Sequence, residues 1–328
     1  MNQPASAETA GRIGRLQHFP IAFFSIVMGL AGLTIAYEKA ESVLQSPVRL
    51  SAYLLAATGA VFAVVAGLYL LKLVRHPASV AKELHHPVRL SFFPTISVSL
   101  ILLGIGTLNT APQLSFWLWG VGAAAHLAFT LYVMDVWIHH QHFEIHHINP
   151  AWFIPVVGNI LVPIAGMRHG FGELSWFFFS IGLLFWLVLL TIIFYRVIFH
   201  HPLPERLVPT FFILIAPPAV GFISYVNLAG DIDGFARVLY YAALFLTLLL
   251  AAQFFRFARL KFFLSWWAYS FPLAAITVAS FVMYSHTGLT MHRIVAVLLL
   301  AVLSLIIALL VYNTAQAIAR REICVEEA

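Results

Sequence analysis

The chain has 328 residues, of which 62% are hydrophobic and only 9% are charged. A soluble domain of this length would carry far more charge on its surface, so this composition excludes a soluble globular protein and indicates several membrane-spanning helices. The net charge of +5 is scattered between apolar segments, which argues against a nucleic-acid partner, and the single cysteine, Cys324, excludes an intrachain disulfide and a thiolate metal site.

Ten apolar segments follow a polar stretch at residues 1–18. A bilayer core needs about 20 apolar residues per helix, and such segments are predicted near 19–38, 49–74, 88–109, 113–137, 150–168, 173–198, 207–229, 234–258, 264–286 and 292–317. The connections between them are mostly short, which predicts five helical hairpins. We therefore expect an all-α polytopic membrane protein with an N-terminal tail (1–18), a ten-helix domain (19–317) and a C-terminal tail (318–328).

The lysines and arginines are distributed unequally between the two sides of this predicted topology. An even number of spans places both termini on one side, and 13 of the 18 Lys and Arg residues fall on that side. Positive charge is retained in the cytoplasm during membrane insertion. Both tails are therefore predicted to be cytoplasmic.

Prolines separate the ten segments into two kinds. Each odd-numbered segment has a proline close to aromatic residues, whereas the even-numbered segments have no internal proline. Proline kinks a helix, and in a membrane the freed carbonyl is tolerated where it meets neighbouring groups or a water-filled cavity. We expect the odd-numbered helices to surround a pore, with kinks at Pro20, Pro94, Pro155, Pro217, Pro218 and Pro272.

Five motifs carry a family resemblance: FPIAFFSIVMGLAGL (19–33), HPVRLSFFP (86–94), NPAWFIPVVGN (149–159), IAPPAVGFISY (215–225) and SWWAYSFPLAA (265–275). With them the chain resembles the family of TehA-like tellurite-resistance proteins, plant slow anion channels and yeast malate permeases. The resemblance implies five hairpins in quasi-fivefold symmetry around one pore per protomer, in a homotrimer. The short tails resemble those of bacterial members, which implies the bacterial inner (plasma) membrane.

The resemblance also implies a gate. Phe271, in the motif WAYSFP, matches the phenylalanine that occludes the family's pore, and Phe24, in AFFS, matches the aromatic residue beside it. Four polar residues of the odd-numbered segments are candidates to line the pore, although each hydroxyl or amide can instead bond its own helix backbone. These candidates are Ser25, Ser97, Asn159 and Ser270.

The helix interiors contain almost no charge, which argues against a proton pump with a buried carboxylate. A pore lined by small and hydroxyl-bearing residues passes weakly hydrated anions. We expect a channel for small monovalent anions that is not an enzyme and needs no cofactor. The alternative is a secondary transporter of C4-dicarboxylates or sulfite, or tellurite-linked efflux, for which His126 in the fourth segment is a candidate proton site.

The stretch IHHQHFEIHH (138–147) has the spacing of a metal-binding histidine box. A di-iron membrane enzyme needs several such boxes, and HFEIHH is the only one, so no metal site is predicted and a metalloenzyme is an unlikely alternative. On the predicted topology the stretch is a cytoplasmic loop, where histidines titrate near neutral pH. The candidates for such a pH-sensing loop are His139, His140, His142, His146 and His147.

Overall fold

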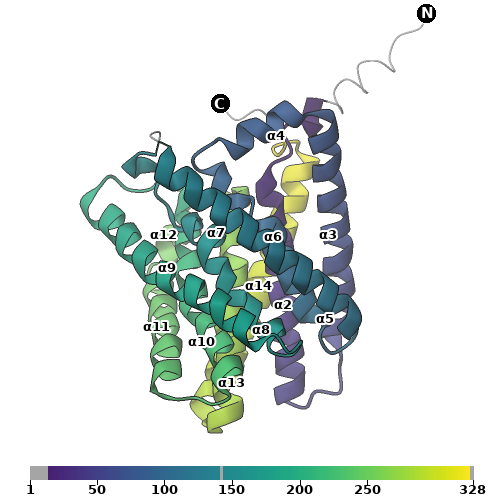
Figure 1. The fold of residues 1–328 in the computed structure, drawn as a ribbon, viewed down its shortest axis with the longest axis vertical. Coiled ribbons are helices and arrows are strands. Elements are labelled where there is room, and N and C mark those ends of the chain that lie inside the picture. The colour runs from purple at the N-terminus through teal and green to yellow at the C-terminus, as the bar shows by residue number, and fades with distance from the viewer. Residues whose placement is uncertain (1–13, 141–142, 326–328) are drawn as a thin grey trace, which may run out of the picture.

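The computed structural model describes residues 14–140 and 143–325. Over these residues the regular structure is helical and contains no strand (Figure 1). The two described ends of the chain lie together, since the Arg15 guanidinium donates a hydrogen bond to Ile323 O at 3.4 Å. We call this the terminal end of the helix bundle and the opposite one the distal end.

Nine helical stretches of the described chain are long and apolar enough to cross a bilayer. They are Ile21–Val43, Leu50–Arg75, Arg89–Thr107, Pro112–His139, Gly172–Phe199, Glu205–Ala229, Gly234–Ala251, Leu264–Thr287 and Thr290–Ala319. Nine of the ten predicted segments are thus found as long helices, and the protein is an all-helical, multi-pass membrane protein.

The predicted segment at 150–168 has a different form. Its apolar stretch, Pro150–Gly166, consists of four short helices: η4 (Pro150–Trp152), α7 (Phe153–Val157), η5 (Gly158–Leu161) and α8 (Val162–Gly166). Pro155 and Pro163 lack the N–H groups that a continuous helix would use, so the backbone changes between 3₁₀ and α geometry.

The helices form an inner and an outer set. In the outer set only 17–39% of the most apolar window is buried, whereas the other spans bury 67–83% of theirs. The outer helices therefore present most of their surface to lipid, as the proline-free segments were predicted to do. They are α3 (Leu50–Arg75), α6 (Pro112–His139), α9 (Gly172–Phe199), α11 (Gly234–Ala251) and α14 (Thr290–Ala319).

Four inner helices begin with a 3₁₀ segment at the terminal end. The pairs are η1 (Ile21–Phe23) with α2 (Phe24–Val43), η2 (Arg89–Phe92) with α5 (Thr95–Thr107), η6 (Glu205–Ile215) with α10 (Ala216–Ala229), and η7 (Leu264–Tyr269) with α13 (Ser270–Thr287). Pro94, Pro217 and Pro272 lie where the α-helical part begins. A proline in a first turn costs no helical hydrogen bond, so these prolines mark the change of helix type.

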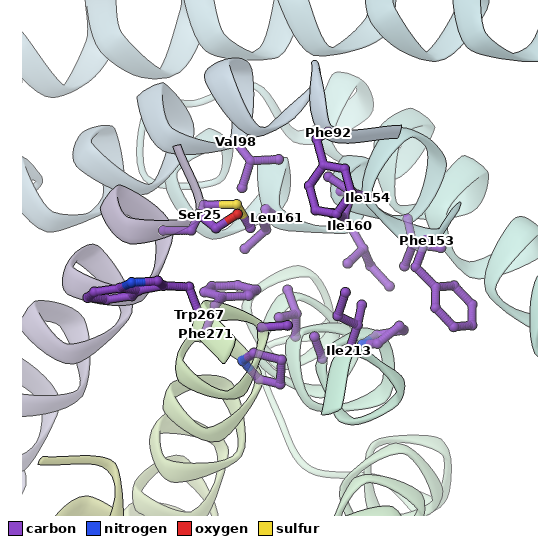
Figure 2. A pocket seen from close by; sticks show the side chains of 18 residues that line it. Ser25, Phe92, Val98, Phe153, Ile154, Ile160, Leu161, Ile213, Trp267 and Phe271 are labelled. Carbon is purple, nitrogen blue, oxygen red and sulfur yellow. The ribbon is translucent and has the colours of Figure 1, made fainter. Parts of the chain in front are cut away.

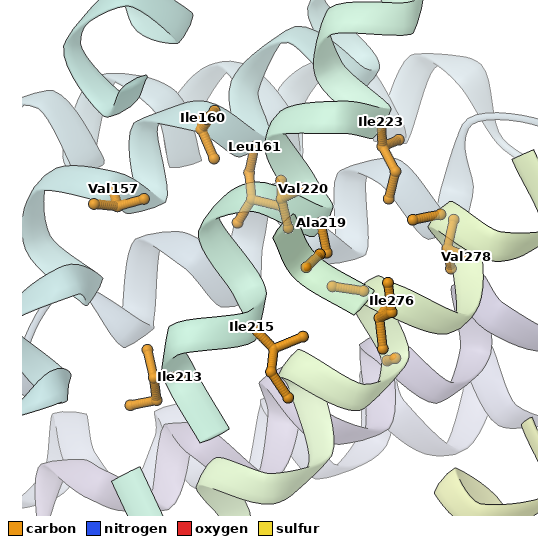
Figure 3. Packing of buried hydrophobic residues seen from close by; sticks show 14 of the residues in the cluster. Val157, Ile160, Leu161, Ile213, Ile215, Ala219, Val220, Ile223, Ile276 and Val278 are labelled. Carbon is orange, nitrogen blue, oxygen red and sulfur yellow. The ribbon is translucent and has the colours of Figure 1, made fainter. Parts of the chain in front are cut away.

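The core lies where the inner helices meet the interrupted segment. Figure 3 shows Val220 of α10 beside Leu161 of η5, with Ile276 of α13 in the same cluster of buried apolar side chains. At the terminal end of the bundle, the outer helices α3, α6 and α11 are each followed by a short helix. These are α4 (Pro77–Leu84), η3 (Ile145–His147) and α12 (Phe254–Ala258).

Tight turns join the helices at the distal end. Gly230 and Gly288 follow α10 and α13 with φ values of +83° and +66°, a conformation that glycine adopts without steric cost. Asp233 then caps α11 by accepting a hydrogen bond from Ala236 N at 2.9 Å. That bond, aided by the Tyr225 hydroxyl, holds the pKa of the Asp233 carboxyl below its ordinary value.

Two glycines allow α2 to cross α13 closely. A Cβ on Gly29 would lie 2.8 Å from Ser270 Cβ, and one on Gly32 would lie 2.8 Å from Ala274 Cβ. Contacts this short are not tolerated between carbon atoms, so the crossing requires glycine at both positions.

Gly29→Ala is expected to lower the free energy of unfolding by about 1–3 kcal/mol, because α13 must move to admit the methyl group. Thermal unfolding in detergent measures this. Gly120→Ala in α6 is the matched control, since nothing lies within 4 Å of the added carbon. Equal stability of the two variants would contradict the assigned close crossing.

Candidate functional site

Three cavities follow one another along the inner helices. A vestibule of about 440 Å³ lies at the terminal end, a central cavity of about 70 Å³ comes next, and a distal cavity of about 50 Å³ follows. Ser25, Phe92 and Ala268 line both the vestibule and the central cavity, so these two spaces adjoin. Even the smaller spaces exceed the volume that one water molecule needs, about 10–15 Å³.

The central and distal cavities adjoin at a ring of apolar side chains. Phe271, Leu161 and Val220 line both spaces. The Phe271 ring also faces α2, because a Cβ on Gly32 would lie 3.4 Å from Phe271 Cδ2. Phe271 therefore contributes to the walls of both cavities.

The central cavity is almost wholly apolar. Its lining side chains converge from several helices, with Phe92 and Phe271 reaching in from different ones (Figure 2). Ser25 supplies a hydroxyl, whereas the indole N–H of Trp267 is directed to Thr314 Oγ1 at 3.0 Å. No Lys, Arg, Asp, Glu or His side chain lines this cavity in the described part of the chain.

The vestibule carries most of the charge near this pathway. Arg89, Arg206, His18 and His86 line it, together with the carboxylates Glu83 and Glu322. Cys324 lines it too, and burial raises the pKa of its thiol, so the thiol adds no negative charge at neutral pH.

A buried ion pair holds one of these carboxylates. Lys72 Nζ lies 2.8 Å from Glu83 Oε2, and the two side chains are only 1% and 5% exposed. The Tyr69 hydroxyl donates to the same carboxylate at 2.9 Å, and Lys72 also donates to Phe19 O at 2.8 Å. The pair therefore ties α3 and α4 to the start of the first inner helix.

Of the four predicted pore-lining polar residues, Ser25 lines the cavities. The other three are fully buried away from them and have hydrogen-bond partners. Ser97 donates to Pro94 O at 2.8 Å, Asn159 donates to Val156 O at 2.8 Å, and Ser270 donates to Trp267 O at 2.6 Å.

Phe24 lies apart from Phe271. Its ring is 1% exposed and packs edge-on against Tyr69 and Phe62 of α3, at centroid distances of 6.0 and 6.2 Å. It is absent from the lining of all three cavities.

The predicted kink prolines are distributed along the pathway. Pro217 and Pro272 line the central cavity, and Pro20 lines the vestibule. The remaining three, Pro94, Pro155 and Pro218, are buried behind the cavity walls.

The histidine-rich loop lies outside the three cavity linings, and His142 falls outside the described residues. His139 Nδ1 lies 3.1 Å from Asp135 Oδ1, and His146 Nδ1 lies 3.1 Å from Glu144 Oε2. Glu144 N donates to His147 Nδ1 at 3.1 Å.

Two further observations concern this loop. Within residues 14–140 and 143–325, no group of three or more His, Cys, Asp or Glu side chains is arranged to hold a metal ion. The loop is fixed from one side by Arg196, whose guanidinium donates to Ile145 O at 2.8 Å and also to His201 O.

Most of the apolar side chains that line the central cavity were not predicted from the sequence. Phe92 and Phe153 line the central cavity, and each lies two residues before a proline, in SFFP and WFIP. That shared spacing was a signal that could have found them. No comparable sequence pattern indicates that Arg89 and Arg206 line the vestibule, because many other basic residues also lie next to helix ends.

Comparison with known proteins identifies the family. The family model described as voltage-dependent anion channel, SLAC1, matches residues 18–315. The S-type anion channel SLAH3 of Arabidopsis thaliana is 29% identical over 306 residues, covering 91% of this chain and 48% of the plant protein. The chain thus spans about half the length of that relative.

Two microbial relatives match over most of their own length. The uncharacterized transporter MJ0762 of Methanocaldococcus jannaschii is 29% identical, covering 83% of this chain and 87% of that protein. The tellurite resistance protein TehA homolog of Haemophilus influenzae is 28% identical, covering 81% of each. Because the family match extends over most of its length, the chain belongs to the SLAC1 family of voltage-dependent anion channels.

Proposed function

We propose that the protein is an anion channel whose pore runs through the vestibule, the central cavity and the distal cavity, and is closed by Phe271. The observation that carries this proposal is the position of Phe271, which lines the cavities on both of its sides. The SLAC1 family match and the similarity to S-type anion channels support anion transport as the general activity.

The chemistry of the pathway favours small monovalent anions. Arg89 and Arg206 at the vestibule attract anions from solution. Beyond them the central cavity offers the Ser25 hydroxyl within an otherwise apolar wall. A weakly hydrated monovalent anion loses its water at least cost there, so selectivity follows dehydration energy.

The same proposal includes the topology. We assign Pro150–Gly166 as an interrupted tenth span, which gives five hairpins, quasi-fivefold symmetry and both termini in the cytoplasm. The alternation of buried and exposed helices and the excess of Lys and Arg toward the terminal end support this arrangement. We further propose a homotrimer in the bacterial inner membrane, with the transmembrane domain at residues 19–317.

In this proposal Phe24 and the histidine loop have smaller roles than the sequence predicts. Phe24 packs α2 against α3 through Tyr69 and Phe62, and its ring lines none of the three cavities. The histidine loop adds titratable charge at the cytoplasmic face, outside the pore lining.

A secondary transporter of C4-dicarboxylates or sulfite is the second candidate. It is favoured by His126, a fully buried titratable group in direct contact with Gly158 of the central cavity. A channel and a carrier differ in saturation, since carrier flux reaches a maximum as substrate concentration rises.

Purified protein in liposomes is expected to carry nitrate and chloride faster than malate or sulfite. Ion-selective electrodes or a halide-sensitive dye measure the efflux, with protein-free liposomes as the control. Flux of the two monovalent anions at the level of protein-free liposomes, in correctly inserted protein, would reject the channel proposal. Flux of malate or sulfite that saturates and exceeds nitrate flux would favour the carrier.

A further inference from the structure

A buried polar cluster lies between α5, α6 and the interrupted segment, at mid-membrane. Its members are Ser97, His126, Thr130 and Asn159, and none is more than 2% exposed. Thr130 Oγ1 donates to Pro155 O at 2.7 Å and accepts from Asn159 Nδ2 at 2.9 Å. Of these four, His126 is the ionisable one, and ionisable side chains are rare inside membranes and mark functional positions.

Within this cluster the His126 ring has one partner and one vacant position. His126 Nδ1 lies 2.9 Å from Ser97 Oγ, which itself lies 2.8 Å from Pro94 O. A hydroxyl has one proton, so when Ser97 donates to Pro94 O it accepts from Nδ1–H, and Nε2 then holds the free lone pair. Nε2 is buried and has no hydrogen-bond partner.

The vacant nitrogen lies directly behind the wall of the central cavity. A Cβ on Gly158 would lie 2.5 Å from His126 Nε2 and 3.2 Å from Val98 Cγ2. Gly158 and Val98 both line the central cavity. Gly158 therefore borders both the imidazole and the proposed anion pathway, on the vestibule side of Phe271.

No other charge lies close to this ring in the described structure. The elements packed against α6 here are α5, α7, η5 and α8. None of their residues is Asp, Glu, Lys, Arg, His, Cys or Tyr. On α6 itself the nearest such groups are Tyr132 and Asp135, six and nine positions further along the helix.

We propose that His126 is a proton-binding site coupled to anion occupancy of the central cavity, so that a proton on Nε2 and an anion beside Gly158 stabilise each other. An imidazolium ion in an apolar interior is costly without a neighbouring opposite charge. Since no carboxylate is adjacent, the permeating anion is the available counter-charge. The proton comes from water that enters the cavity and returns to it when the anion leaves.

This inference rests on the proposed anion pathway and adds a pH dependence to it. Coupling between two sites is reciprocal, and typical values change binding by about 5- to 150-fold. A buried imidazolium is costly, so His126 is protonated only at a lower pH than an exposed histidine. We therefore expect nitrate flux through the parent protein, at sub-saturating nitrate, to rise by about fivefold or more between about pH 7.5 and about pH 5.

The test compares the parent with His126→Asn in proteoliposomes, using nitrate flux at both pH values. Asparagine keeps a polar group near Ser97 but cannot take up a proton in this range. His292→Asn is the matched control. His292 is also fully buried on an outer helix, with Nδ1 2.9 Å from Thr287 Oγ1 and an unpartnered Nε2. It lines none of the three cavities, and neither does Tyr240, against which its ring packs.

The expected result is loss of the acid stimulation in His126→Asn and its retention in His292→Asn. Stimulation that persists in a folded His126→Asn protein overturns the inference, even though the channel itself remains. A parent whose flux does not change with pH overturns it without any variant. Absence of nitrate flux from the parent at both pH values instead removes the proposed function.

The titratable groups of the vestibule and the loop are tested separately. Replacing His18 and His86 by glutamine, or the five loop histidines by glutamine, leaves His126 in place. If either variant loses the acid stimulation while His126→Asn keeps it, the proton site lies at the mouth of the pore and the inference fails.

Discussion

Replacing Phe271 by alanine is expected to raise nitrate and chloride flux through the reconstituted protein by about tenfold or more, because a barrier lower by about 1.4 kcal/mol gives a tenfold rate. The phenylalanine side chain lines both the central and the distal cavity, and in the proposed channel it excludes water from the path between them. Alanine removes the ring, so the two spaces merge and an anion retains part of its hydration on crossing.

The matched control is Phe281→Ala in the same helix. Phe281 is fully buried against Ala40 and Ala296 and lines none of the three cavities. Its loss should lower the free energy of unfolding by about 3–5 kcal/mol through the vacated volume. It should not increase flux, so a rise in both variants would mean that loosened packing, and not an opened gate, conducts anions.

Phe271→Leu separates the size of the ring from its apolar character. Leucine is smaller but equally apolar, so flux intermediate between the parent and Phe271→Ala is expected. Flux no higher than the parent in both Phe271 variants, in folded and inserted protein, would remove this residue from the gate.

The arrangement of the helices could be predicted because it depends on periodic, chain-wide patterns. Both helix sets are apolar, but the inner helices carry prolines and the lipid-facing ones have no internal proline, so their alternation is visible in the sequence. The interrupted form of the segment at 150–166 was harder to predict. Its apolar length suited a continuous helix, whereas Pro155 and Pro163 divide it into short pieces.

The lining of the pathway was predicted less well, for a physical reason. Ser97, Asn159 and Ser270 are polar residues on inner helices, but each donates to the backbone carbonyl three residues earlier and lines no cavity. Which side of the helix such a residue occupies depends on helix rotation. A shift from α to 3₁₀ geometry changes that rotation, and its extent cannot be counted from the sequence.

The ion pair between Lys72 and Glu83 illustrates a second limit of sequence-based prediction. The count of Lys and Arg residues that predicts the topology includes Lys72, but it does not indicate which carboxylate pairs with it. In the structure the two side chains are 1% and 5% exposed and share the Tyr69 hydroxyl. The carboxylate also lines the vestibule, where an unpaired negative charge would repel incoming anions.

Lys72→Met is therefore expected to lower the free energy of unfolding by about 3–5 kcal/mol, because it leaves a buried carboxylate without its partner. Thermal or denaturant unfolding in detergent measures the change. The double variant Lys72→Met/Glu83→Gln removes both charges and should recover most of the loss, since replacing a complete buried pair by neutral groups is often close to neutral. Glu83→Gln alone completes a double-mutant cycle, which gives the coupling energy of the two side chains.

The functional consequence follows from the same charge. In Lys72→Met the anion flux should fall relative to the parent, and Glu83→Gln added to it should restore the flux, because the uncompensated carboxylate is then removed from the vestibule. If Lys72→Met is as stable as the double variant and conducts equally well, Glu83 is not an uncompensated charge in the absence of Lys72. The pair would then hold α3 and α4 against the first inner helix without governing anion entry.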